Sequence, residues 1–236
     1  MNALTKFNPE NPGFPRACRV TFGRHHDVVL PNHRLSLGAI ILSAGSSSRM
    51  GRPKMLLPWG ETTVLGHLIG LWTRLPVEQL VVVCAPTDAA LAAELDRLRF
   101  PVANRIANPT PNRGMFSSIQ CAARWPGWSP ALTHWAIALG DQPHLQPATL
   151  AALADFAFRH PGKICQPARR GHARHPVTLP AEAFAALKDA DDETLKQFLQ
   201  RKSASVQWVE LDDPGLDLDL DHPADYKEAL RLAFGN

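Results

Sequence analysis

The sequence LGAIILSAGSSSRMGRPKMLLPW, residues 37–59, decides the fold of this chain. It begins with a short apolar run, residues 39–42, whose two consecutive isoleucines suit a strand buried on both faces. The run opens into a loop of small residues, 43–48, whose backbone N–H groups and hydroxyls leave room for a polyanion. Arg49 and Lys54 add two cations beside the loop. The segment therefore predicts a triphosphate-binding loop, and the alternative is an ordinary serine-rich turn between a strand and a helix.

Spacing excludes two other kinds of phosphate-binding loop. A P-loop needs a lysine directly after its last glycine, whereas two residues separate Gly51 from Lys54. A dinucleotide-binding loop needs the pattern G-x-G-x-x-G at the start of a helix, and the glycines at Gly45 and Gly51 do not supply it. Pro53 also prevents a helix from running through the segment. The loop is therefore of another type.

The pattern L-S-A-G-x-S-x-R-M-G-x-x-K-x-L-L-P-W, which starts at Leu42, resembles the nucleotide-binding loop of the MobA-like nucleotidyltransferases, especially the molybdenum cofactor cytidylyltransferases. Guanylyl-transferring relatives usually carry Gly-Gly where this chain has Ala44 and Gly45, so the resemblance favours the cytidylyl branch. It implies nucleotide contacts from these loop residues: Leu42, Ala44, Gly45, Ser46, Ser47, Arg49, Met50, Gly51 and Lys54.

Composition indicates a globular protein with one substantial domain. The chain has 236 residues, 45% hydrophobic and 20% charged, and no apolar run reaches the ~20 residues of a membrane span. The net charge of +3 arises within residues 1–37, so the rest has no basic footprint for nucleic acid. The four cysteines lack zinc-site spacing, and residues 1–15 lack the apolar core of a secretory signal, so we expect a cytoplasmic protein. We expect residues 1–36 to form an extension, loosely ordered or packed on the surface, and residues 37–236 a single domain.

Strand and helix patterns alternate from residue 38 onwards. Strands are expected at residues 39–42, 80–84, 102–106, 135–139, 164–166, 176–179 and 206–211. Helices are expected after Thr62 or Thr63, after Asp88, at 115–124, from Pro147, near Phe184 and at 194–201. This alternation predicts a mostly parallel sheet with helices on both faces, a three-layer α/β/α sandwich. The resemblance implies the Rossmann-like, GT-A type nucleotidyltransferase fold, and ligands of such sheets bind at the carboxyl ends of the strands.

Asp141 directly follows the expected strand 135–139, within the sequence GDQP. A carboxylate at the end of a strand, locked by a following proline, suits a hard cation such as Mg²⁺. The alternative is a turn aspartate that hydrogen-bonds its own backbone. The tetrapeptide resembles the family's metal-binding segment, and this resemblance implies a metal ligand at Asp141.

An acidic run near the C-terminus is the second unusual element. Asp217, Asp219 and Asp221 alternate with leucines and would share one face of an extended chain. Three like charges so close need solvent or a cation, and the alternative is an exposed acidic edge. Residues 219–226 resemble the family pattern D-[IL]-D-T-P-E-D-[LY], with His222 and Ala224 in place of the usual Thr and Glu, both at expected helix-cap positions. The resemblance implies Asp219 as the second metal ligand, with Asp221 close behind.

A third group of polar residues surrounds the expected helix 115–124. Asn108, Gly114 and Ser118 match a family N…G-M-x-S-S segment, which implies contacts with the nucleotide. Ser117 and Ser118 would lie in the first turn of the helix, where free N–H groups favour an anion. Both serines are equally well explained as helix caps.

The acceptor side is the least determined by sequence. The resemblance implies acceptor contacts from Ser117, Gln142 and His175, the last in an H-A-R-H-P segment that partly matches a family Gly-His-Pro element. Arg174 stands where that element usually has glycine. His175 is equally well explained by loop structure, and the arginines at 169, 170 and 174 by contact with an acceptor phosphate or with solvent.

We therefore predict an Mg²⁺-dependent transfer of CMP from CTP to the phosphate of molybdopterin, with Mn²⁺ as an alternative metal. The acceptor's own phosphate oxygen attacks the α-phosphorus and pyrophosphate leaves, so the catalytic residues Arg49, Lys54 and Asp141 supply charge and alignment. The partners are the nucleotide and a phosphorylated pterin, with transient contact to a molybdoenzyme or its chaperone as a further prediction.

Three alternatives remain open at this point. The first is a relative with another base or acceptor, since residues 191–199 lack a Gly-Asp-x-Gly pattern associated with cofactor cytidylyltransferases. The second is a nucleotide-binding accessory protein without turnover. The third is a glycosyltransferase of the same fold, against which the first-loop Arg/Lys pair favours a triphosphate donor.

Overall fold

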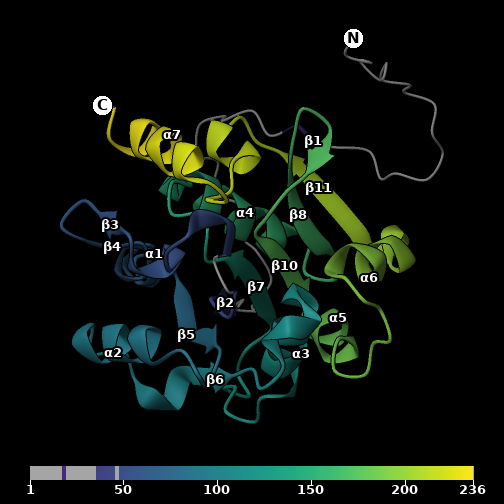
Figure 1. Cartoon of the computed structure of the whole chain (residues 1–236). Coiled ribbons are helices and arrows are strands. Elements are labelled where there is room, and N and C mark those ends of the chain that lie inside the picture. Colours follow the sequence, from purple (N-terminus) through teal and green to yellow (C-terminus); the bar gives the residue numbers. More distant parts are fainter. Residues whose placement is uncertain (1–17, 20–35, 46–47, 236) are drawn as a thin grey trace.

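A nine-stranded sheet forms the centre of the protein (Figure 1). The computed structural model describes residues 18–19, 36–45 and 48–235. The strands are β1 (Cys18–Arg19), β2 (Leu37–Leu42), β5 (Val77–Cys84), β6 (Arg105–Ala107), β7 (His134–Leu139), β8 (Ile164–Arg169), β9 (His172–Ala173), β10 (Val177–Pro180) and β11 (Val206–Glu210). Their order is β1-β11-β8-β10-β7-β2-β5-β6, with β9 beside β8. The pairs along this path are parallel except those of β10, which is antiparallel to both β7 and β8.

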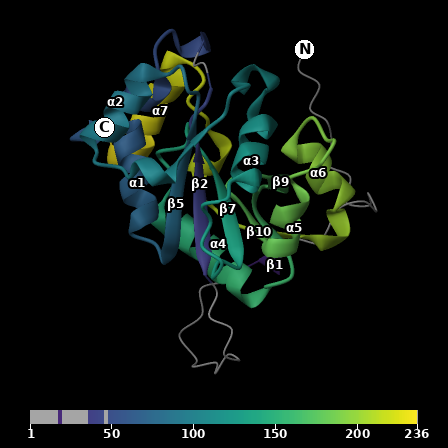
Figure 2. The same cartoon turned by 90° about the horizontal axis from the view of Figure 1, so that it is seen from below.

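Helices cover both faces of the sheet (Figure 2). The helices are α1 (Val64–Thr73), α2 (Ala89–Arg97), α3 (Met115–Arg124), α4 (Pro147–Arg159), α5 (Ala181–Ala186), α6 (Leu195–Arg201) and α7 (Pro223–Phe234). One apolar cluster joins the sheet to α1, α2, α4 and α7, and the other joins it to α3, α5 and α6. Ala39 and Ile41 of β2 point into the first cluster, and Ile40 into the second. The predicted three-layer α/β/α sandwich with a mostly parallel sheet is confirmed.

The helices begin where the sequence places their caps. The Thr63 hydroxyl accepts a hydrogen bond from the Gly66 N–H at 3.0 Å, and the Asp88 carboxylate accepts one from the Leu91 N–H at 3.0 Å. Such bonds satisfy backbone donors that a first helical turn leaves unpaired. Thr194 caps α6 in the same way within a capping box. None of the helices in the described part of the chain has the length and apolar character needed to span a bilayer.

Three features differ from the expectations. Residues 102–104 form a 3₁₀ turn, so the expected strand begins only at Arg105. A short hairpin, β3 (Pro58–Trp59) and β4 (Thr62–Thr63), was not predicted, whereas the helix α7 begins after the expected cap position His222. β1, a strand not expected within the N-terminal extension, pairs in parallel with β11. The rest of that extension, residues 1–17 and 20–35, lies outside the described residues.

Gly140 brings two loops together at the carboxyl edge of the sheet. Its N–H donates to the Leu42 carbonyl at 3.0 Å, which joins the residue after β7 to the end of β2. A Cβ added at Gly140 would lie 2.5 Å from the Leu42 carbonyl oxygen, a distance no side chain tolerates. The loop after β2 and the loop that carries Asp141 are therefore neighbours, as the sequence predicts.

Candidate active site

Three segments converge at the carboxyl ends of β2 and β7. The first is the loop after β2, the second is the loop that carries Asp141, and the third precedes α7. The third segment is fixed by a backbone hydrogen bond in which the Leu220 N–H donates to the Asp141 carbonyl at 3.0 Å. Carboxylates and cations far apart in sequence are thereby placed side by side.

Lys54 lies at the centre of this charged cluster. Its Nζ is 2.8 Å from Asp221 Oδ1 and 3.3 Å from Asp141 Oδ2. Arg49 approaches the other oxygen of Asp221, with its NH1 group 2.7 Å from Oδ2. The Lys54 hydrogen bond, followed by the charges of Lys54 and Arg49, holds the pKa of Asp221 below its usual value. The Lys54 side chain is 13% exposed and that of Arg49 is 64% exposed, so the lysine is fixed in place while the arginine extends into solvent.

Asp219 has a different environment from Asp221. Its Oδ1 accepts a hydrogen bond from Gln142 Nε2 at 2.8 Å. Burial, and next the negative charge of Asp141, raise the pKa of Asp219 above its usual value. Two neighbouring carboxylates that repel each other in this way are stabilised by a cation between them.

The side chains around Asp141 and Asp219 fit a magnesium ion that would take its remaining ligands from substrate phosphates and water. Asp141 and Asp219 supply carboxylates, and the Oε1 of Gln142 is buried and lacks a hydrogen-bond partner among the residues that the structure describes. No group of three or more His, Cys, Asp or Glu side chains with metal-binding geometry occurs within that same part of the chain. Mg²⁺ is commonly held by one or two carboxylates together with phosphate oxygens and water, so the pair meets its needs.

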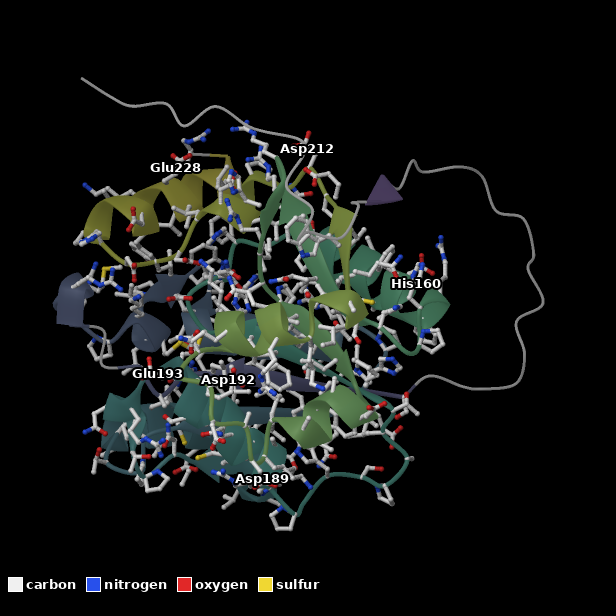
Figure 3. All side chains as sticks on the ribbon, turned by 90° about the vertical axis from the view of Figure 1, so that its right-hand side faces the viewer. His160, Asp189, Asp192, Glu193, Asp212 and Glu228 are labelled. Atoms are coloured by element: carbon white, nitrogen blue, oxygen red, sulfur yellow. The ribbon has the colours of Figure 1, made fainter. Side chains whose placement is uncertain are left out.

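The expectation of one acidic face along residues 217–221 is wrong. Asp217 closes a 3₁₀ turn, Pro214–Asp217, so the extended geometry assumed for residues 217–221 does not hold there. It accepts hydrogen bonds from Arg174, at 2.7 and 2.9 Å, and pairs with Arg169. These arginines were expected to meet an acceptor phosphate or solvent, and instead they pair with a carboxylate. Asp212, labelled in Figure 3, pairs with the same Arg169 at 3.3 Å.

Asn108, Ser117 and Ser118 form a buried hydrogen-bonded group. Asn108 Nδ2 donates to the two serine hydroxyls at 2.8 and 2.9 Å, and the Ser117 hydroxyl donates to the Gly114 carbonyl at 2.7 Å. All three side chains are buried. They hold together the loop before α3, and neither serine caps the helix, because its N-cap is Gly114 and makes no side-chain cap hydrogen bond. Gly114 itself has a φ of +89° and open space where a side chain would be, which leaves its backbone accessible.

The loop residues divide into exposed and buried ones. Gly45 and Gly51 have open space around their Cα atoms, and Gly51 has a φ of +71°. Met50 is 4% exposed and packs in the core, so its side chain does not face the loop opening. Ser46 and Ser47 lie outside the described residues. The nucleotide contacts of this loop stay a prediction.

A hollow of about 370 Å³ adjoins the loop and was not predicted. It is lined by Ser43, Gly45 and residues 51–56, and on its far side by Asp88 and Leu91. The Ser43 hydroxyl is buried and has no hydrogen-bond partner among the described atoms, so it is available to a ligand. Asp88 and Leu91 follow β5 in the chain, and no local sequence signal places them beside a loop 40 residues earlier.

A second hollow, of about 470 Å³, lies between α5 and α6. Its lining includes Asp189, Asp192 and Arg201, and Arg201 pairs with Asp192. Figure 3 shows Asp189 and Asp192 far from Asp212 and Glu228. None of its lining residues belongs to the candidate site.

His175 lies close enough to Asp141 for the two to interact electrostatically. Burial lowers the pKa of His175 to about 4, against smaller opposing effects of the Ile137 backbone and the Asp141 charge. The imidazole is therefore neutral at pH 7.

His175→Gln is expected to flatten the dependence of stability on pH. The folded state holds His175 neutral down to about pH 4, whereas the unfolded chain protonates it below about 6.5. Acid therefore favours the unfolded state, and His175 should remove about 2 kcal/mol of the free energy of unfolding between pH 7 and pH 5. Urea unfolding of both proteins at the two pH values measures this. Equal losses in both proteins would contradict the assignment.

The fold and the charged cluster at the carboxyl ends of β2 and β7 define a nucleotidyltransferase. Residues 39–206 match the model of the MobA-like NTP transferase domain, and the chain belongs to this family. The chain is an enzyme of the nucleotidyltransferase class, as the resemblance implies.

Curated relatives and solved structures agree with this family. A molybdenum cofactor guanylyltransferase from Rhizobium johnstonii is 28% identical over 70% of this chain and 75% of its own length. A molybdenum cofactor cytidylyltransferase from Escherichia coli is 26% identical over 81% of this chain and 94% of its own. The crystal structure of Rv0371c from Mycobacterium tuberculosis is 25% identical, covers 84% of this chain and 98% of its own, and has a TM-score of 0.67. The structure of its complex with manganese covers the same shares at 25% identity, with a TM-score of 0.63.

Proposed function

We propose that this enzyme transfers CMP from CTP to the phosphate of molybdopterin, with release of pyrophosphate. The observation that carries the proposal is the position of Lys54 between Asp141 and Asp221, where the loop after β2 meets the end of β7. Lys54, a partly buried cation, therefore lies beside Asp141, which together with Asp219 forms a carboxylate pair suited to Mg²⁺. Such a combination serves an attack on the α-phosphorus of a triphosphate.

The protein's own groups would align and neutralise the reactants. Arg49 and Lys54 would pair with phosphate oxygens, and the N–H groups around Gly45 and Gly51 would approach the chain of phosphates closely. His175, Gln142 and Ser117 are the side chains proposed to face the acceptor. Of these, His175 and Gln142 lie beside Asp141 and Asp219, while Ser117 is buried in its own network. No protein nucleophile is required, because the acceptor brings its own phosphate oxygen.

Asp141 and Asp219 would hold the metal ion. When bound, Mg²⁺ would neutralise charge on the phosphates, and Mn²⁺ is the alternative because Rv0371c has been crystallised in complex with manganese. The raised pKa of Asp219 also supports this role, since a cation would relieve the repulsion from Asp141.

The proposed nucleotide base, cytosine, has less support than the proposed type of reaction. Ala44-Gly45 at the start of the loop favours cytidylyl transfer, whereas the curated relatives include both a guanylyltransferase and a cytidylyltransferase. Guanylyl transfer to molybdopterin is therefore the second candidate. A transient encounter with a molybdoenzyme or its chaperone, which would receive the product, belongs to the same proposal.

Pyrophosphate release from CTP, GTP, ATP and UTP, each with Mg²⁺ and molybdopterin, tests the proposal. We expect release with CTP at a rate at least tenfold above that with GTP. Release with GTP alone would overturn the cytidylyl assignment. Binding of nucleotide without any release would favour an accessory protein without turnover.

A further inference from the structure

Both carboxylate oxygens of Asp221 are engaged by cations. Oδ1 lies 2.8 Å from Lys54 Nζ, and Oδ2 lies 2.7 Å from an Arg49 guanidinium nitrogen. These are the two cations that the proposed function assigns to the triphosphate. Asp221 thus presents to them the same pattern of two anionic oxygens that a phosphate group would present.

The carboxylate is held in this position by its backbone. The Leu220 N–H donates to the Asp141 carbonyl at 3.0 Å, and the Asp221 N–H donates to the Asp219 carbonyl at 2.9 Å. α7 begins two residues later and is anchored in the core by Ala229, which is fully buried. Asp221 therefore stays at the site. The side chains of Lys54 and Arg49 are the groups that would have to move when they exchange Asp221 for a phosphate.

Asp219 and Asp221 have separate surroundings although they are two residues apart. Asp219 accepts a hydrogen bond from the Gln142 amide, and its largest charge interaction is the repulsion from Asp141, with only a smaller attraction to Lys54. Asp221 already has a lysine and an arginine. The two carboxylates therefore suit different roles, the first toward a metal ion and the second toward the phosphate-binding cations.

We propose that Asp221 competes with the polyphosphate for Lys54 and Arg49. It keeps the two cations together at the end of β2 and must release them, at least in part, to an incoming triphosphate. The inference rests on the proposed function in that it takes these cations to bind phosphates. Asp221 is then a positioning residue. It holds Lys54 and Arg49 until a polyphosphate takes its place, and it lowers their affinity for a polyphosphate without bound metal.

The test is the affinity of Asp221→Asn for inorganic tripolyphosphate and for CTP, by titration calorimetry in EDTA at about 50 mM salt. Asn keeps the shape but loses the charge, so both ligands should bind about 5–20-fold more tightly than to the wild type. In about 1 M salt, where screening acts within ~3 Å, the difference should shrink. A residue with a merely structural role would weaken binding when replaced, so the sign of the change is diagnostic.

Control variants separate this effect from net charge. Asp155→Asn removes the same charge from an exposed ion pair on α4 and should leave the affinity unchanged. Asp221→Glu keeps the charge and should give no tightening. Lys54→Ala combined with Asp221→Asn should lose the gain, because the released cation is absent. If Asp221→Asn is poorly folded by circular dichroism, Asp221→Ser is measured instead, and the same sign is expected.

Unchanged or weaker binding by a folded charge-neutral variant would overturn the inference. Tripolyphosphate carries neither base nor acceptor, so tighter binding would support the inference even if turnover with CTP and molybdopterin failed. Failure of the wild type and all variants to bind either ligand in EDTA would overturn the inference, whereas the proposed function is judged separately by pyrophosphate release in the presence of Mg²⁺.

Discussion

Asp141→Ala is expected to lower the rate of pyrophosphate release at least about 10³-fold, which corresponds to about 4 kcal/mol of transition-state stabilisation. The carboxylate lies at the end of β7, where it contacts Lys54 at 3.3 Å and interacts with Asp219. Without it, the proposed metal pair loses one of its two carboxylates and Lys54 loses an anionic partner. Stopped-flow or coupled-enzyme measurement of pyrophosphate gives the rate.

The protein should stay folded in this variant. The Asp141 side chain is 28% exposed, and loss of its ion pair should cost less than about 1 kcal/mol in the free energy of unfolding. Asp155→Asn, on the exposed surface of α4, is the control for loss of a negative charge and should retain its rate. A rate within threefold of the wild type for Asp141→Ala would remove Asp141 from the metal site.

Gly140→Ala is expected to lower the free energy of unfolding by about 2–3 kcal/mol and the melting temperature by about 4–12 °C. The added Cβ would lie 2.5 Å from the Leu42 carbonyl oxygen and 2.8 Å from Met55 Sδ. The methionine side chain can move, but the carbonyl belongs to the backbone of β2, so the loop after β7 must shift. Because Asp141 follows directly, we expect turnover to fall about 10²-fold as well.

Gly70→Ala provides the matched control for this substitution. Gly70 lies in α1, where an added Cβ meets no atom within 4 Å. Alanine is the better helix former, so the variant should be as stable as the wild type or more stable by up to about 1 kcal/mol. Calorimetric unfolding of both variants measures the difference. Equal stabilities would show that the close approach at Gly140 does not constrain the fold.

The parts of the fold that follow from local pattern could be predicted from sequence. The apolar run in β2, the cap at Asp88 and the proline that opens α4 are local signals, and the structure confirms each of them. α7 has equally local signals, with the expected cap position His222 before it, Pro223 in its first turn and Gly235 at its end. The strand at Cys18–Arg19 has none, because its two residues gain structure only by pairing with β11.

The candidate site shows the same division. The meeting of Lys54 and Asp141 follows from the rule that parallel strands bring their carboxyl ends to one edge of the sheet. The ion-pair partners of Asp217, Asp219 and Asp221 do not follow from any such rule. The sequence prediction assumed an extended chain, whereas a 3₁₀ turn begins at Pro214 and includes Asp217. Sequence therefore predicted that the carboxylates lie near the loop after β2, but it did not predict the pairing of Asp221 with both cations.

The central claim is that the chain transfers a nucleotidyl group, and labelled CTP tests it most directly. With Mg²⁺ and molybdopterin, label at the α-phosphate is predicted to move into the pterin product, and label at the γ-phosphate into pyrophosphate. The two labels should move in equal amounts and at equal rates. Recovery of the γ label as inorganic phosphate or on the acceptor, with the α label left in CDP, would contradict the account.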